Sequence, residues 1–387
     1  MTVCILGNGL TALTLAKALV NCKIDVELLY NKKNYNISNT STIGITKNNI
    51  DFFNNNIIDI KKIIWYVEKA AKGQGTHSKL CLAYIRILQE LPITDPGSVT
   101  FYNWPQNYVP KNQRFYNKKI QIHGPHISQT SYHYHPGHIY VCFAANSLGG
   151  GIVGSKGFVQ EEIAVFQSNQ FPLHVMWKDS NRRKPKYLEK LNEEPVIMKV
   201  RHLFELHPDL YASKGREIVE NWASSPTSSV GDIVTKARPN LDILWANMAA
   251  VNMKRMNNRD FNAEAIVNSM THTAFLCFAR AALVWHINNN KTRNKTTVCD
   301  LHTGNWGAGD FGHDPKVVFL IQWEAVQRAA SYLREELKIP EVELQLRFHL
   351  QLCLHATSAK ANSGRKRPSW TRWKTVGSPG ACPQDSF

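Results

Sequence analysis

The chain has 387 residues and a formal net charge of +16 at pH 7, from 46 Lys and Arg against 30 Asp and Glu. Its length favours two domains, since a domain holds roughly 150 residues. Hydrophobic residues make up 43% of the chain and aromatic residues 10%, which excludes a disordered or collagen-like protein. The sequence contains no uninterrupted apolar run of about 18 residues, so we expect no membrane span.

The net charge indicates which kind of partner the protein binds, and the cysteine pattern indicates the redox state of its compartment. A positive charge of this size favours a polyanionic partner such as nucleic acid or another phosphate polymer. The eight cysteines form no CxxC pair and indicate neither a zinc ribbon nor a disulfide framework. We therefore expect a reducing compartment: the cytoplasm, or the nucleus if the source is a eukaryote.

Residues 1–65 begin like a βαβ unit, with strands predicted at 3–6 and 24–30 and a helix at 13–20. The turn after the first strand fits the GxGxxG/A pattern of dinucleotide-binding folds through Gly7, Gly9 and Ala12.

This opening resembles that of FAD-dependent ubiquinone-biosynthesis hydroxylases, which implies that the three turn residues contact FAD. The acidic residue that should follow the second strand and hold the ribose is replaced by Tyr30-Asn31. Nothing later in the chain resembles the rest of such an enzyme. We therefore expect no FAD cofactor and interpret 1–65 as a fused, partial Rossmann-like segment.

Two further stretches carry weaker signals. Residues 66–137 have irregularly spaced prolines and histidines and one predicted helix at 80–91, which favours a connecting or accessory region. Periodicity fades in 339–387, where Lys360–Lys374 holds six basic residues and no acidic one. We expect a basic, disordered tail there that makes at most weak contact with a polyanion.

Residues 138–338 alternate strands with helices, which is typical of a layered α/β domain. Strands are predicted at 139–145 and 297–301, and helices at 160–166 and 261–286. A further helix should begin at Asp314-Pro315, because Asp favours the cap position and Pro the first helical position.

The first motif joins a glycine triplet, Gly149-Gly150-Gly151, to Gln160-Glu161-Glu162 at the start of a predicted helix. Three glycines after a strand expose backbone N–H groups to phosphate oxygens. Carboxylates beside such a loop can perform acid–base chemistry on a bond next to a diphosphate. An ordinary turn followed by a solvated acidic first turn explains the spacing equally well.

The second motif, Thr303–Gly312, holds four glycines between a strand and a helix. It predicts a second anion cradle at a helix N-terminus, with Phe311 as a flat face for a sugar or base. The alternative is an ordinary turn, although such turns seldom need this many glycines.

The phrases Phe143–Gly151 and Val159–Ile163, followed by Thr303–Gly312, resemble the signature of the poly(ADP-ribose) glycohydrolases. The resemblance covers about 138–335 and implies a macrodomain, a mixed sheet between helices that binds terminal ADP-ribose and cleaves ribose–ribose bonds without a metal. Glu162 would protonate the leaving ribose oxygen and then activate water, and Glu161 would hold ribose hydroxyls. The implied ADP-ribose contacts are Asn146, Gly149, Gly150, Gly151, Gln160, Asn305, Gly307, Ala308, Gly309, Asp310 and Phe311.

The chain departs from this family at three positions. Many members carry an aspartate where this chain has Cys142, and their asparagine falls at Ala145, with Asn146 displaced by one. In the second motif, many members have a cysteine where this chain has Ala308.

A binding module that holds ADP-ribose without turnover therefore stands as the alternative function, and an FAD-dependent oxidoreductase as the third. The expected partners are poly(ADP-ribose) or ADP-ribosylated proteins, and Tyr187 and Tyr211 are the candidates for stacking on adenine.

A histidine-rich segment remains outside these motifs. Five histidines fall within sixteen residues, and a His-x-His pair is able to bind zinc. No cysteine or carboxylate nearby in the sequence completes a ligand set, so we expect a surface loop without a metal. The five are His123, His126, His133, His135 and His138.

Overall fold

The computed structural model describes residues 2–6, 25–29, 57–75, 77–102, 122–128, 132–154, 157–179, 188–253, 262–289, 297–308, 311–341 and 344–351. The chain divides into two compact units, 1–55 and 56–387. In the first unit, β1 (Thr2–Leu6) and β2 (Asp25–Leu29) pair in parallel, as the βαβ pattern predicts. The predicted helix at 13–20 and the FAD candidates Gly7, Gly9 and Ala12 lie outside the described residues.

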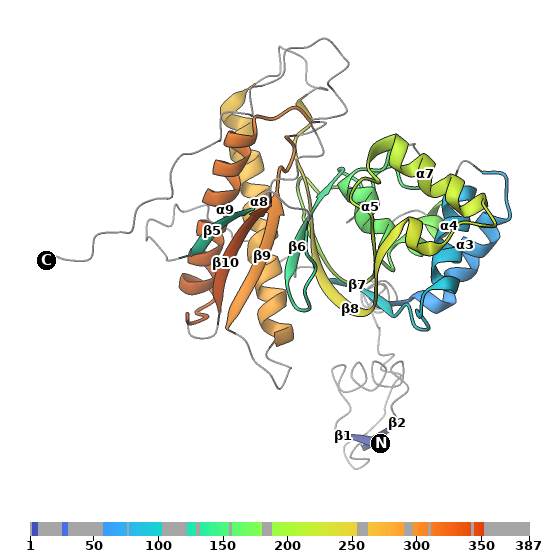
Figure 1. The fold of residues 1–387 in the computed structure, drawn as a ribbon. Coiled ribbons are helices and arrows are strands. Elements are labelled where there is room, and N and C mark those ends of the chain that lie inside the picture. The colour runs from blue at the N-terminus through green and yellow to red at the C-terminus, as the bar shows by residue number, and fades with distance from the viewer. Residues whose placement is uncertain are drawn as a thin grey trace, which may run out of the picture. The chain divides into compact units, whose positions relative to one another are not determined.

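The second unit contains helices and strands in mixed order (Figure 1). The strands are β3 (Ile57–Asp59), β4 (Ser98–Tyr102), β5 (His123–Ser128), β6 (Ile139–Ala144), β7 (Val196–Leu206), β8 (Val234–Ala249), β9 (Val298–Gly304) and β10 (Gln345–Gln351). The helices are η2 (Ile60–Lys62), α3 (Ile64–Ala71), α4 (Ser78–Glu90), α5 (Gln160–Phe166), α6 (Phe171–Asp179), α7 (Ala212–Ser224), η5 (Val230–Asp232), α8 (Ala263–Asn289) and α9 (Pro315–Glu335).

The strands of this unit form one eight-stranded sheet in the order β3-β4-β7-β8-β6-β9-β10-β5. The pairs β3–β4, β4–β7 and β7–β8 are antiparallel. The pairs β8–β6, β6–β9, β9–β10 and β10–β5 are parallel. The predicted mixed sheet between helices is therefore confirmed. The strand β6 is apolar on both faces because it lies between parallel neighbours and is covered on both sides.

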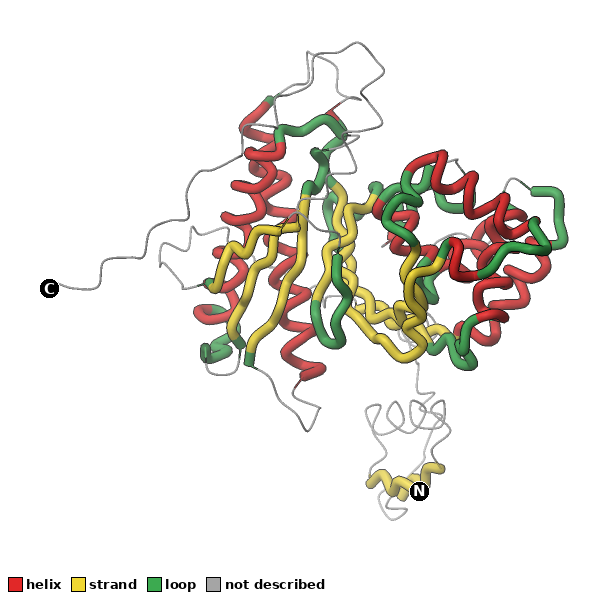
Figure 2. The backbone as a smooth tube through the Cα atoms, viewed as in Figure 1, coloured by secondary structure: helices red, strands yellow, loops and turns green. Residues whose placement is uncertain are grey.

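Each face of the sheet has its own hydrophobic core. On one face, α8 and α9 pack against β6, β8, β9 and β10, and Figure 2 shows the two long helices side by side along the strands. On the other face, α5 and α6 pack against β6, β7 and β8, and α3, α4 and α7 extend this layer. None of the described helices is long and apolar enough to span a membrane.

The strands β6 and β9 pair only at the start of β6, where Ile139 lies opposite Leu301 and Tyr140 opposite His302. Beyond this point β6 remains paired with β8, and its backbone also forms hydrogen bonds with a side chain of α5. The Gln160 amide donates to the Val141 carbonyl at 3.2 Å and accepts from the Phe143 N–H at 3.0 Å. The start of α5 is thereby attached to the place where the two strands diverge.

The element boundaries differ from the sequence prediction in three places. The segment 66–137, expected to be a connection, contributes β4 and β5 to the sheet, and β3 comes from the predicted Rossmann-like segment. The strand β10 lies inside the expected disordered tail and pairs with both β9 and β5. These strands are short or lie near the sheet edges, so their alternation is brief and their stability comes from long-range pairing.

A buried histidine on β7 makes stability depend on pH. The His202 side chain is fully buried, neither ring nitrogen has a hydrogen-bond partner among the described residues, and the ring lies 4.0 Å from that of Tyr134. Burial, together with the smaller effect of the Arg238 charge, lowers the pKa of His202 to about 3. Below about pH 6.5 the unfolded chain therefore binds a proton that the folded chain excludes.

We expect the free energy of unfolding to fall by about 2 kcal/mol from pH 7 to pH 5 through His202 alone. Urea unfolding of the wild type and of His202→Phe at both pH values measures this contribution. The phenylalanine variant should lose less stability on acidification than the wild type. Equal losses in both proteins would show that His202 does not carry the effect.

Candidate active site

The first motif lies at the carboxyl edge of the parallel strands. The glycine triplet follows β6, the second motif follows β9, and residues 250–253 follow β8, so three loops leave the sheet at the same edge. Loops at this edge are where open α/β sheets bind ligands.

The Glu161 side chain is 3% exposed and is bound by the loop after β6. Its Oε2 accepts from the Ala145 N–H at 2.8 Å, and its Oε1 accepts from the Gly149 N–H at 2.7 Å. Hydrogen bonds from backbone N–H groups to an ionised carboxylate are short and strong. They fix both the position and the orientation of the Glu161 carboxylate.

The Glu162 side chain is 6% exposed and is held in the same way. Its Oε1 accepts from the Gly151 N–H at 2.9 Å, and its Oε2 accepts from the Val159 N–H at 3.1 Å. The second bond is the reach-back contact of a glutamate at the third helical position, which caps α5. Two adjacent carboxylates therefore lie against one loop, each with both oxygens bonded to backbone.

The glycines of this loop leave room for these carboxylates. Gly150 has φ +47°, and a Cβ there would lie 2.4 Å from Glu162 Oε1 and 2.7 Å from Glu161 Oε2. Gly149 has φ +87°, and a Cβ there would lie 2.0 Å from Cε1 of His174, a buried residue of α6. Side chains are thus excluded both by conformation and by contact.

The structure differs here from the expected phosphate cradle. The N–H groups of Gly149 and Gly151 donate to the two glutamates, and that of Gly150 lies 3.4 Å from the Ser147 carbonyl. The donors of the triplet are therefore used inside the protein. The triplet orients the carboxylates, because only glycine lets a carboxylate approach the backbone so closely.

The thiol of Cys142 lies close enough to this pair to interact with both carboxylates. It is buried, and burial raises the pKa of the Cys142 thiol, with the charges of Glu161 and Glu162 adding to the shift. A neutral thiol avoids placing a third negative charge beside the two glutamates.

The second motif is tightly packed at its base. A Cβ on Gly304 would lie 2.4 Å from the Gln351 carbonyl oxygen and 3.2 Å from the Phe143 ring. Phe143 also donates its N–H to Gln160, so it contacts residues of both motifs. Gly307 has φ +72°, and a Cβ there would lie 2.7 Å from Cβ of Ala250.

Further contacts hold the second loop to the segment after β8. The His313 Nε2 lies 2.6 Å from the Val251 carbonyl, and the Met253 N–H donates to the Phe311 carbonyl at 3.1 Å. As predicted, α9 begins at Pro315, and the Asp314 carboxylate caps it by accepting from the Lys316 N–H at 2.7 Å.

The structure places the predicted site residues in several different parts of the site. Glu161, Glu162 and the triplet contact one another, and Gln160 binds the β6 backbone. Asn146 instead contacts the 188–192 segment, where its Oδ1 accepts from the Asn192 N–H at 3.2 Å. Asn305, Gly307, Ala308 and Phe311 lie in the loop after β9, whereas Gly309, Asp310 and Tyr187 are outside the described residues. Tyr211 stands at the N-cap position of α7, where its side chain makes no capping hydrogen bond.

His174 was not predicted from the sequence. It comes from α6 and approaches the loop only through tertiary packing, so no local spacing signals it. Its ring packs where a Gly149 side chain would be, and it therefore limits how that glycine loop can move.

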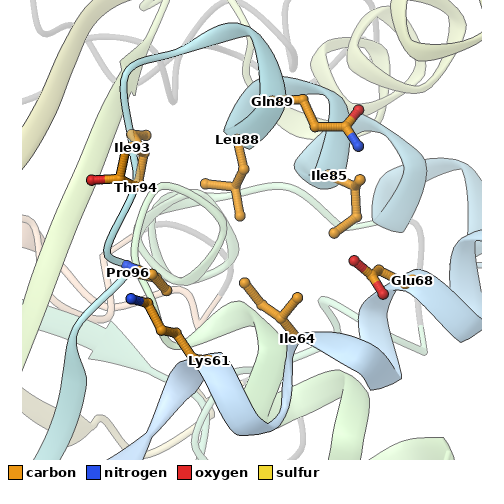
Figure 3. Close-up of a pocket in the computed structure, with 9 residues that line it drawn as sticks. All are labelled: Lys61, Ile64, Glu68, Ile85, Leu88, Gln89, Ile93, Thr94 and Pro96. Atoms are coloured by element: carbon orange, nitrogen blue, oxygen red, sulfur yellow. The ribbon is translucent and has the colours of Figure 1, made fainter.

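A separate shallow cavity of about 210 Å³ lies between α3 and α4 (Figure 3). Apolar side chains such as Ile64, Ile85 and Leu88 point into it, with Lys61 and Glu68 as its charged groups. None of the predicted site residues lines it. Its lining offers no pair of carboxylates or cluster of donors for the chemistry considered above.

Comparison with known protein families gives a match that includes the second motif. Residues 234–337, which include β8, α8, β9 and α9, match a family model described as poly(ADP-ribose) glycohydrolase, macro domain fold. The glutamate motif lies outside this matched segment. A comparison with curated proteins found no match.

Three solved structures of poly(ADP-ribose) glycohydrolase from Thermomonospora curvata are similar to this chain. A point mutant matches at 15% identity over 56% of this chain and 63% of its own, with a TM-score of 0.27. The enzyme itself matches at 12% identity over 76% and 84%, with a TM-score of 0.31. Its complex with the inhibitor ADP-HPD matches at 13% identity over 78% and 79%, with a TM-score of 0.28.

The family match includes the second glycine loop and the two helices that cover one face of the mixed sheet. Residues 234–337 are therefore similar to the poly(ADP-ribose) glycohydrolase family, whose model is described as having the macro domain fold.

Proposed function

We propose that this chain hydrolyses the ribose–ribose O-glycosidic bonds of poly(ADP-ribose) and releases ADP-ribose. The observation that carries the proposal is the pair of adjacent buried carboxylates, Glu161 and Glu162, held by four backbone N–H groups at the carboxyl edge of the sheet. The match of residues 234–337 to the poly(ADP-ribose) glycohydrolase model supports the same substrate class.

In this proposal Glu162 is the general acid and base. Its protonated carboxyl gives a proton to the leaving ribose oxygen while the glycosidic C–O bond breaks and an oxocarbenium-like ribose forms. The resulting carboxylate takes a proton from water, and the water oxygen bonds to the anomeric carbon. The proton on Glu162 is restored, so one water is consumed and no cofactor or metal is needed.

The Glu161 carboxylate would orient the substrate. The N–H groups of Ala145 and Gly149 hold its two oxygens at the loop, and a carboxylate oxygen can accept more than one hydrogen bond, including one from a ribose hydroxyl. We assign the diphosphate to the loop after β9, because the triplet donors already bind the two glutamates. Phe311 in that loop offers an apolar surface to the adjacent ribose.

A binding module is the second candidate. Both oxygens of Glu162 accept backbone hydrogen bonds, one of which caps α5, so a purely structural role for this side chain is consistent with its contacts. Such a protein would bind terminal ADP-ribose and leave the polymer intact.

The test follows free ADP-ribose by chromatography during incubation with purified poly(ADP-ribose) and, separately, with a protein that bears a single ADP-ribose. We expect release from the polymer. Release only from the singly modified protein would overturn the proposed substrate. Binding of ADP-ribose without either reaction would favour the binding module.

A further inference from the structure

A cluster of histidines surrounds one aspartate on the sheet, away from the two glycine loops. Asp300 and His302 of β9 share a face because alternate residues of a strand point the same way. The intervening Leu301, with Cys299, belongs to the core formed with α8 and α9. Asp300 and His302 therefore lie on the opposite face of the sheet.

The run of histidines before β6 reaches this cluster. His138, directly before β6, has its Nδ1 2.9 Å from Nε2 of His302 and its Nε2 3.5 Å from Oδ2 of Asp300. One ligand atom from each of the three side chains lies within 4.8 Å of the others. Asp300 and His302 are 4% and 5% exposed, while the His138 side chain is 27% exposed.

We propose that His138, Asp300 and His302 form a binding site for a divalent transition-metal ion, with zinc as the best match to two imidazoles and one carboxylate. Zinc binds such nitrogen and oxygen atoms at about 2.0–2.2 Å. Two nitrogens on one tetrahedral zinc lie about 3.3 Å apart, so the 2.9 Å between the two imidazoles needs to widen only slightly. The fourth position is open to water.

Neighbouring side chains hold the Asp300 carboxylate in position by hydrogen bonds. Its Oδ1 accepts from Nε2 of His349 at 2.6 Å and from Nε of Arg347 at 2.5 Å, while Oδ2 faces His138. Carboxylates that bind metals are commonly hydrogen-bonded in this way by residues behind them. His302 also has a buried Nδ1 with no hydrogen-bond partner among the described residues.

Arg347 competes with a cation for the same carboxylate. Its second donor, NH2, lies 2.7 Å from Asp300 Oδ2. The Arg347 side chain is 41% exposed, so it can turn toward solvent when a cation binds. Arg347 should therefore weaken metal binding without being required for the fold of the sheet.

The sequence could not reveal this site. The five clustered histidines lack a nearby carboxylate in the chain, and β9 supplies both the carboxylate and a second imidazole from more than 160 residues away. Parallel pairing of β6 with β9, at Tyr140 and His302, is what brings them together.

The test titrates zinc chloride into the chelator-treated full chain by calorimetry. We expect one zinc per chain in the wild type and at least about tenfold weaker binding in His138→Gln. The His138 side chain is 27% exposed, more than that of Asp300 or His302, so the substitution buries no new polar group in the core. His207→Gln is the matched control, because its ring contacts the Gly231 carbonyl outside the cluster and zinc binding should be unchanged. Asp300→Asn provides a second ligand variant, with circular dichroism to verify the fold.

Arg347→Gln separates a metal site from a structural network. Removing this positive charge should tighten zinc binding by about tenfold or more, an effect that a merely structural role would not produce. No zinc binding by the wild type, equal binding by wild type and His138→Gln, or weaker binding by Arg347→Gln would overturn the proposal.

Discussion

Glu162→Gln is expected to slow the release of ADP-ribose from poly(ADP-ribose) by about 10²–10⁴-fold, the usual contribution of a positioned general acid and base. Glutamine keeps the size and one acceptor oxygen of Glu162, so the bond to either Gly151 or Val159 can be retained. Since glutamine also serves at the third position of a helix cap, α5 should remain formed.

The variant should still bind ADP-ribose, because only the proton-transfer group has changed. Calorimetry with ADP-ribose and urea unfolding of the same preparation provide this control. Comparable stability and affinity with slow release would assign the proton transfer to Glu162. An unchanged rate of release would contradict the assignment, and a loss of affinity equal to the loss of rate would indicate a binding role.

Gly150→Ala is expected to slow the release of ADP-ribose by at least about 100-fold. The added Cβ would lie 2.4 Å from Glu162 Oε1, and the backbone has φ +47°, a region that alanine rarely adopts. Displacing a catalytic group by about 1 Å can cost about 10²-fold in rate. The conformational strain should also lower the free energy of unfolding by about 1–3 kcal/mol.

Two other glycines provide matched controls for this variant. Gly137→Ala tests positive φ alone, because Gly137 has φ +76° and no described atom within 4 Å of the added Cβ. Gly154→Ala tests the substitution in the same loop, again with no described atom within 4 Å. Loss of activity in Gly150→Ala with activity retained in both controls would support the close approach of the carboxylates. Full activity of Gly150→Ala would contradict it.

The parts of the fold that were predicted have strong local signals. The helix α8 has a long apolar pattern, α9 starts with a capping aspartate and a proline, and the apolar strand β6 leads into a glycine triplet. In each case neighbouring residues alone favour the element. The same holds for α5, whose bounds coincide with the prediction.

The parts that were not predicted depend on residues far apart in the chain. The strand β10 is stable because it inserts between β9 and β5, and its own sequence mixes buried apolar and half-buried polar residues. The pairing of β7 with β8 is antiparallel and irregular in register. No short window contains this information.

In the candidate site, too, some features could be predicted from neighbouring residues and others depend on tertiary structure. The two glutamates and the triplet were identified from spacing, since acid–base chemistry needs those residue types close together. The roles of the triplet N–H groups could not be predicted from spacing. How α5 packs against the loop decides whether the N–H groups of Gly149 and Gly151 bind a phosphate or a glutamate. The approach of His174 from α6 depends on tertiary structure in the same way.

The most direct test of the central claim measures release of free ADP-ribose from purified poly(ADP-ribose) by the wild type and by Glu162→Gln, with ADP-ribose affinity determined for both. The account predicts release by the wild type, release at least about 100-fold slower in the variant, and similar affinities. Absence of release by both proteins, with ADP-ribose bound by both, would contradict it and identify the chain as an ADP-ribose-binding module.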